Sequence, residues 1–253
     1  MPVAPNQSAL KRRIDRYLWS NDSSETAILN SALSRHFRYF DRVAIIGGLV
    51  RDFAREGRSG FHSDVDLVIN SPAEEVSRLA AKLNAVPNRF GGFGYRDGPW
   101  KIDFWALENS WARRHVEIFS FNDLLSATFF DWDAVAYDLW DRKLICPKDY
   151  LSRIGQRTLE INLRENPSPM GNLVRAVRRL VLWAVEPGPR LKDFIEEYLD
   201  DSSLRFIQAK ELELFSEQVS CRWSTAREAK EFLFLPPPKR DHDQLEILLS
   251  RDD

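Results

Sequence analysis

One segment constrains the fold most. Between residues 43 and 70, a short apolar run, a pair of glycines and a second apolar run carrying two aspartates follow one another. The run "VAIIGG" predicts a buried strand that ends at its glycines. "LVRDFARE" predicts a helix directly after them, and "SDVDLVIN" predicts a second strand. A strand, a helix and another strand in quick succession favour a sheet with helices packed against it.

The rest of the chain shows two kinds of pattern. Residues 9–40 predict helices, and "RFGGFGYRDGPWKIDFWAL" predicts two strands joined around Asp97-Gly98. After Pro147 the apolar spacing becomes helical. We therefore expect an α+β protein. A mixed β-sheet flanked by helices fills a domain over residues 1–147, which includes the N-terminal helices in 9–40, and an all-helical C-terminal half follows over residues 148–253.

Composition narrows the setting of this fold. Apolar residues make up 43% of the 253 residues, enough for sizeable cores. The net charge of −2 excludes a global basic field, so any nucleic acid must be held by a local patch. No run of 18 apolar residues and no signal-peptide pattern occurs, so no membrane is expected as a partner. The two cysteines lack metal-ligand spacing, which favours a reducing compartment, and we expect the cytoplasm.

Three carboxylates are the candidate catalytic and metal-binding residues. Asp64 and Asp66 lie two apart on a predicted strand, so their side chains point to the same face. A cation relieves their repulsion, and Mg²⁺ is the hard ion that suits oxygen ligands in phosphoryl transfer. Asp103, in the otherwise apolar "WKIDFWAL", is the candidate third acid, because a lone acid there is costly unless it faces a polar cleft. For the first pair alone, a solvated strand face is the competing interpretation.

The upstream glycines favour the catalytic interpretation. Gly47 and Gly48 end a strand and open a helix, and bare amides at a helix N-terminus bind phosphate groups. Arg51, one turn further, can add a bidentate contact to phosphate. An ordinary strand-to-helix turn explains the glycines in isolation, but the combination with the acids predicts a site for a nucleotide.

These residues resemble a known family. "GGLVRD" followed by "SDVDLVI" is similar to the head-domain signature of CCA-adding enzymes and bacterial poly(A) polymerases, within the DNA polymerase beta-like nucleotidyltransferase superfamily. "FFDWDAVAYDLWDRKLICPKDYLSRIGQRTLEIN" resembles the stretch that follows there, and "LVRAVRRLVLWAV" resembles the neck helix. The similarity covers roughly residues 40–185.

The resemblance implies an Mg²⁺-dependent nucleotidyltransferase with an NTP substrate. Its implied metal ligands and catalytic acids are Asp64, Asp66 and Asp103. Its implied nucleotide-binding residues are Gly47, Gly48, Arg51, Arg175 and Arg178, the last two on the neck helix. The family's neck also carries an acid and an arginine that select the incoming base, whereas Pro169 and Asn172 stand at those positions here. We therefore expect altered base selectivity rather than an ordered C-C-A product.

The acceptor has three alternatives. The first is an RNA 3′ end, tRNA-like, whose phosphates Arg113 and Arg114 are best placed to contact. The second is a stand-alone transferase of the toxin or defence type that modifies a protein, a small molecule or a nucleotide. The third is a degenerate head that binds a nucleotide without activity. Four tryptophans near the site either stack on bases or pack in the core: Trp100, Trp105, Trp111 and Trp132.

Overall fold

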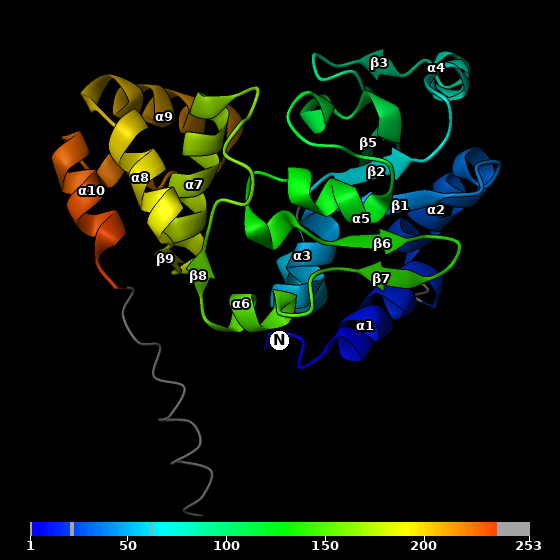
Figure 1. The fold of residues 1–253 in the computed structure, drawn as a ribbon, viewed down its shortest axis with the longest axis horizontal. Coiled ribbons are helices and arrows are strands. Elements are labelled where there is room, and N and C mark those ends of the chain that lie inside the picture. Colours follow the sequence, from blue (N-terminus) through cyan, green and yellow to red (C-terminus); the bar gives the residue numbers. More distant parts are fainter. Residues whose placement is uncertain (1, 21–22, 62, 237–253) are drawn as a thin grey trace, which may run out of the picture. The chain divides into compact units, whose positions relative to one another are not determined.

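In the computed structural model, which describes residues 2–20, 23–61 and 63–236, seven strands form one sheet (Figure 1). The strands are β1 (Val43–Ile46), β2 (Val65–Ile69), β3 (Val86–Pro87), β4 (Phe93–Asp97), β5 (Trp100–Ala106), β6 (Ala136–Asp138) and β7 (Lys143–Ile145). Their order across the sheet is β3-β4-β5-β2-β1-β6-β7. β2 and β5 run parallel, and the remaining neighbours pair antiparallel. The predicted mixed sheet is therefore confirmed, including the hairpin around Asp97-Gly98.

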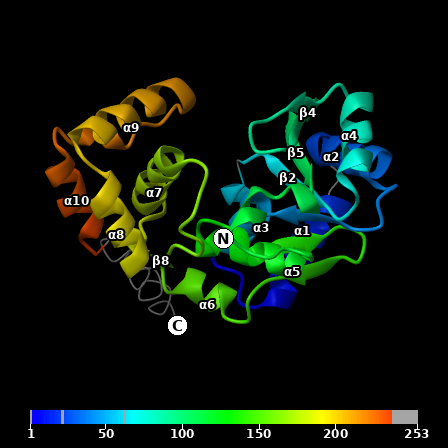
Figure 2. The ribbon, with the colours of Figure 1, turned by 45° about the horizontal axis from the view of Figure 1, so that its top comes forward.

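Helices accompany this sheet, as expected. The helices are α1 (Gln7–Trp19), α2 (Ser24–Ala32), α3 (Gly48–Arg55), α4 (Ala73–Lys82), α5 (Phe121–Leu124) and α6 (Tyr150–Gly155). α2 continues into a π-helical turn, η1 (Leu33–Phe37), and Figure 2 shows α2 and α4 beside β4 and β5. Shorter 3-10 turns are η2 (Gly57–Gly60), η3 (Leu107–Asn109), η4 (Trp111–Arg114), η5 (Leu125–Ala127) and η6 (Asp131–Asp133), and a short strand β8 covers Thr158–Leu159.

The two faces of the sheet carry different residues, because side chains alternate along each strand. One face is apolar throughout its centre, where the ring of Phe37 packs edge-on against Phe104 at 5.4 Å between centroids. On the other face, Ala44 and Val68 pack against the segment that runs from η3 to η5. The register places Asp66 on this second face, two residues before Val68.

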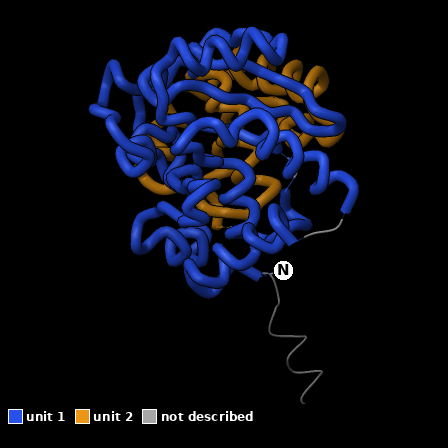
Figure 3. The backbone as a smooth tube through the Cα atoms, turned by 90° about the vertical axis from the view of Figure 1, so that its right-hand side faces the viewer, with its two compact units in different colours: residues 1–168 blue, residues 169–253 orange. Residues whose placement is uncertain are grey.

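The described chain separates into two compact units, residues 1–168 and 169–253 (Figure 3). This division falls later than the expected boundary at Pro147, because the segment after β7 packs on the first unit. There, the Tyr150 hydroxyl donates to the Trp132 carbonyl at 2.8 Å, and Ile161 forms a β-bridge with Phe130.

The second unit is helical, as predicted for the C-terminal half. It contains α7 (Pro169–Trp183), α8 (Pro189–Tyr198), α9 (Asp201–Leu214) and α10 (Ala226–Phe234), with a 3-10 turn η7 (Ser220–Arg222) and a two-residue strand β9 (Glu186–Pro187). Residue types at the helix starts explain where they begin. Pro189 occupies the first turn of α8, and Asp200 forms a capping box with Ser203 at α9. None of the described helices has both the length and the apolar character needed to cross a bilayer.

Candidate active site

The three predicted acids lie on one face of the sheet. Asp66 on β2 stands directly opposite Asp103 on β5 in the parallel register. Asp64 immediately precedes β2, two residues before Asp66, so strand alternation places it on the same face. The sequence predicted that the first two share a face, and the pairing of β2 with β5 brings in the third.

A lysine lies between two of these carboxylates. The Lys101 ammonium donates to Asp64 and, at 3.0 Å, to Asp103. Sequence analysis missed Lys101, although it stands two residues before Asp103 and therefore shares its face. The burial of Lys101 lowers its pKa, but the hydrogen bonds to Asp64 and Asp103 outweigh burial and raise it. The ammonium thus offsets part of the repulsion among the acids.

Asp66 carries the electrostatic signature of a cation site. Burial, followed by the neighbouring carboxylates of Asp103 and Asp64, raises the pKa of Asp66 to about 7. A carboxyl held near neutrality by burial and like charges gains most from a nearby cation, since the cation favours its ionised form. Perturbed groups of this kind cluster at functional sites.

The donor set fits Mg²⁺, because it consists of carboxylate oxygens on a half-buried face. An ion shared by Asp64 and Asp103 would have to displace Lys101, which bridges them in this structure. Within the described ranges, no three acidic, histidine or cysteine side chains already converge as a metal site. Metal binding by this face would therefore exchange one cation for another.

A glycine on the neighbouring strand makes room for the third acid. Gly94 on β4 pairs with Asp103, and a Cβ atom built on it would lie 2.9 Å from the Asp103 carboxylate. Any larger residue at this position would push the carboxylate away. Sequence analysis assigned "GGFG" only to the hairpin and missed this role, for which the glycine itself was the available signal.

The N-terminus of α3 lies next to the acids. Gly47 adopts a φ of +67°, a backbone conformation that favours glycine, at the sharp turn from β1 into the helix. A Cβ on Gly48 would overlap the Ser63 hydroxyl, so the helix start abuts the residue that precedes Asp64. The Ser63 Oγ is buried and has no hydrogen-bond partner among the described residues. The predicted amide site and the predicted acids are thus neighbours.

Arg51 is placed differently from what its motif predicted. Its side chain is only 8% exposed, and it forms ion pairs with Asp52 at 2.9 Å and Asp133 at 2.6 Å. Burial alone would lower the pKa of Arg51, but the two carboxylates hold it above its ordinary value. In this structure Arg51 ties α3 to η6, and a contact with a triphosphate would require this pairing to open.

The two arginines expected on the neck helix, Arg175 and Arg178, differ from each other in how exposed they are. Arg175 is exposed on α7, whereas Arg178 is largely enclosed within the helical unit. Arg178 forms an ion pair with the fully buried Glu211 at 2.7 Å, and its guanidinium lies 3.8 Å from the centroid of the Phe215 ring. Arg175 is therefore free to contact a ligand from solvent, whereas the contacts of Arg178 stabilise the helical unit.

The remaining candidates fall around a cavity of the first unit. Arg113 and Arg114 lie on η4 and are exposed at its rim, together with the half-buried Trp111. The other tryptophans serve the core or its edge: Trp132 is 2% exposed, Trp105 packs on the apolar cluster, and Trp100 stacks on Phe61 at 5.9 Å.

Comparison with known proteins identifies the fold. No family profile matches the chain. No curated protein sequence matches it either. Solved structures do match. They include a CCA-adding enzyme in complex with CTP (TM-score 0.58, 20% identity, 88% of this chain and 54% of that one) and a CCA-adding enzyme in complex with ATP (TM-score 0.56, 19% identity, 83% and 53%). The Thermotoga maritima CCA-adding enzyme complexed with tRNA also matches (TM-score 0.52, 17% identity, 88% and 54%).

The chain therefore has an α+β fold whose head resembles that of the CCA-adding enzymes, and the resemblance stated from the sequence is confirmed. It spans about half the length of the solved structures that it matches. At identities of 17–20%, these similarities establish the fold, and the chemistry has to be argued from the site.

Proposed function

We propose that this protein is a nucleotidyltransferase that transfers NMP from an NTP to a hydroxyl at an RNA 3′ end. The observation that carries the proposal is the placement of Asp66 opposite Asp103, with Asp64 on the same face. The raised pKa of Asp66 supports a cation there, and the adjoining start of α3 supports an anion beside it. The shared fold of enzymes solved with CTP, ATP and tRNA supports the same class.

Each part of the site has a task in this reaction. The amides at the start of α3, from Gly48 onward, bind the triphosphate, because a helix N-terminus leaves its first amides without intrahelical partners. The Gly47 amide already donates to the Val135 carbonyl at 3.0 Å, so Gly47 serves the turn rather than the phosphates. The carboxylates of Asp64, Asp66 and Asp103 would hold Mg²⁺, which when bound lowers the pKa of an attacking hydroxyl and stabilises the leaving oxygen. Asp103 has room for its carboxylate beside Gly94, where it can accept the proton of that hydroxyl.

The direction of the transfer follows from these positions. The acceptor hydroxyl attacks the α-phosphorus, the bond from that phosphorus to the bridging oxygen breaks, and pyrophosphate leaves with the electron pair. The substitution keeps atoms and charge in balance, with the hydroxyl proton passing to a carboxylate or to water.

Base selection is expected to differ from that of the CCA-adding enzymes. Pro169 begins α7, and Asn172 is 3% exposed in its core, where an amide cannot offer both edges to a base. We therefore propose a product of one or a few nucleotides with relaxed base choice. Faithful addition of C-C-A to a tRNA that lacks its end would contradict this part of the proposal.

The decisive experiment supplies each α-labelled NTP with Mg²⁺ and a small-RNA fraction, and measures label in RNA, protein and small molecules. Asp66→Asn should abolish labelling, while Asp41→Asn, an exposed acid outside the site, should not. Label in RNA that depends on Asp66 supports the proposal. Label in protein or small molecules alone would move the acceptor to the second alternative of the sequence analysis, and no label in any fraction would refute transfer.

A further inference from the structure

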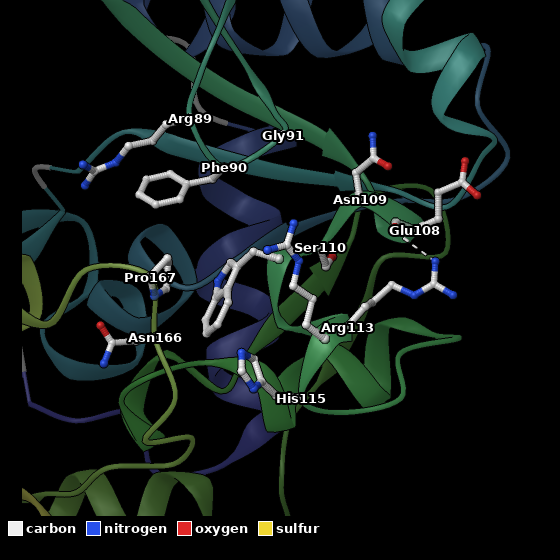
Figure 4. Close-up of a pocket in the computed structure, with 12 residues that line it drawn as sticks. Arg89, Phe90, Gly91, Glu108, Asn109, Ser110, Arg113, His115, Asn166 and Pro167 are labelled. Atoms are coloured by element: carbon white, nitrogen blue, oxygen red, sulfur yellow. Dashed lines mark hydrogen bonds between the residues drawn. The ribbon is translucent and has the colours of Figure 1, made fainter.

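A cavity of about 630 Å³ lies in the first unit (Figure 4). Three segments line it: residues 89–91 before β4, residues 108–111 and 113–115 around η4, and residues 166–167. It is open to solvent, and its lining combines arginines with aromatic rings. Neither the acids nor the helix N-terminus described above belongs to it.

The cavity is positively charged. Its lining contains three arginines, Arg89, Arg113 and Arg114, and one carboxylate, Glu108. Glu108 already accepts a hydrogen bond from the Ala73 amide at the start of α4, and Figure 4 shows its carboxylate directed away from Phe90.

The guanidinium groups of Arg113 and Arg114 are exposed at the cavity, whereas that of Arg89 donates to the Ser168 hydroxyl at 3.3 Å and lies over one face of the Phe90 ring at 4.7 Å. None of them forms an ion pair within the described residues. Arg113 is held in place by donating to the Glu108 carbonyl at 2.9 Å, which leaves its other donors free for a phosphate.

Two aromatic rings line the same cavity. Phe90 is 38% exposed at the tip of a loop that Asn88 fixes by accepting from the amides of Phe90 and Gly92. Trp111 is half-buried and packs edge-on against His115. Flat rings in a basic cavity suit a nucleobase, because every base offers a π-face that stacks.

The cavity continues the face that carries the acids. Asp103 and Trp105 share that face of β5, and the Trp105 indole donates to Ser110 in the cavity wall at 3.1 Å. From Asp103 to the end of β5 is three residues, or roughly 10 Å at the rise of a strand. A single strand with its terminal hydroxyl at Asp103 would therefore bring a nearby nucleotide over the cavity.

From these observations we infer that the cavity binds one nucleotide of a single-stranded RNA acceptor. Its phosphate is held by Arg89, Arg113 and Arg114, and its base stacks on Phe90 or Trp111. The inference rests on the proposed function for the identity of the acceptor. The sequence pointed to Arg113 and Arg114 and gave base stacking as one alternative for Trp111, whereas the structure adds Arg89 and Phe90.

The test measures binding of a fluorescein-labelled, single-stranded RNA oligonucleotide to the full chain by anisotropy, in EDTA and without NTP. The triple variant Arg89→Ala, Arg113→Ala and Arg114→Ala should bind at least tenfold more weakly at low salt. Its salt slope should fall by about 0.7, since the loss of one phosphate contact on a single strand removes about that much. The matched control removes three exposed arginines of α1 and α4, Arg12, Arg16 and Arg78, and should bind like the wild type. Equal binding by both triple variants, or no binding by the wild type, would overturn the inference.

A second pair of variants tests stacking separately from charge. Phe90→Leu should weaken binding about fivefold, whereas Phe90→Trp should preserve it, because only the second keeps a flat ring. Normal binding by Phe90→Leu would refute base stacking on Phe90. Far-UV circular dichroism and a melting curve establish that each variant is folded. Because the assay contains neither NTP nor Mg²⁺, it tests RNA binding separately from nucleotidyl transfer. Loss of RNA binding with transfer to another acceptor would refute only the cavity, whereas RNA binding with full turnover by Asp66→Asn would refute only the assigned catalytic site.

Discussion

Asp66→Asn should stabilise the protein in the absence of metal. The folded state holds the pKa of Asp66 at about 7, against 3.8 for the free group, so ionising it in the folded state costs free energy. Three units at about 1.36 kcal/mol each give an upper bound of roughly 4 kcal/mol. Relaxation of Lys101 toward the carboxylate would reduce this to about 2 kcal/mol, which raises the Tm of a chain of this size by roughly 4–8 °C.

The sign of the pH dependence follows from linkage. Between pH 4 and 7, the unfolded state has released the proton of Asp66 while the folded state still holds it. Folding stability therefore falls as pH rises through this window, and the loss is complete above about pH 7. Asparagine cannot ionise, so the advantage of Asp66→Asn should be less than half of its full size at pH 5 and full at pH 8.

Denaturant titrations in EDTA at pH 5 and pH 8 measure this difference, with Asp41→Asn as the control for loss of one surface acid. Adding Mg²⁺ at pH 8 should stabilise the wild type and not Asp66→Asn, because a cation favours the ionised carboxyl. A variant that is less stable than the wild type at pH 8, or equally changed at both pH values, would refute the assigned electrostatics.

Three other variants probe the surroundings of the acids. Gly94→Ala should lower kcat about tenfold or more with the fold retained, since its methyl group would lie 2.9 Å from the Asp103 carboxylate, and steady-state kinetics with a melting curve will measure both. Asp133→Asn should reduce the free energy of unfolding by about 3 kcal/mol, or somewhat less because Asp52 remains to pair with Arg51. Urea denaturation will measure that loss. Lys101→Met should reduce the Mg²⁺ concentration for half-maximal stabilisation by up to about fivefold, because it removes the competing cation. A melting series in Mg²⁺ that superimposes on the wild type would contradict this role.

The elements of the fold were predictable where their signals are local. The glycines after β1 and the Asp97-Gly98 turn mark where strands end, whatever the rest of the chain does. The boundary between the units was not predictable from local signals. Tyr150 and Ile161 belong to the first unit because they contact residues earlier in the chain, Trp132 and Phe130. Helical spacing after Pro147 carried no information about which unit those residues join.

In the site, too, local patterns predicted some features, whereas others depend on the tertiary fold. That Asp64 and Asp66 share a face follows from strand alternation, but the position of Asp103 opposite Asp66 depends on the parallel pairing of β2 with β5. Arg51 shows the opposite case. Its motif predicts a side chain one turn into the helix that reaches a phosphate, yet Asp133, 82 residues away, pairs with its guanidinium. A motif fixes the position of a side chain along the helix, whereas its partner depends on the tertiary fold.

The inward orientation of Arg51 has a consequence for how the site balances its charges. With Arg51 satisfied by Asp52 and Asp133, Lys101 is the basic side chain seen to contact the acids of the open face. Lys101 can bond Asp64 and Asp103 at the same time, while the raised pKa of Asp66 leaves that carboxyl partly protonated at neutral pH. The lysine and the proton on Asp66 thus reduce the negative charge of the face without a metal ion, but do not cancel it. A cation held by these acids would favour the ionised form of Asp66 and compete with Lys101, so metal affinity should rise with pH up to about 7.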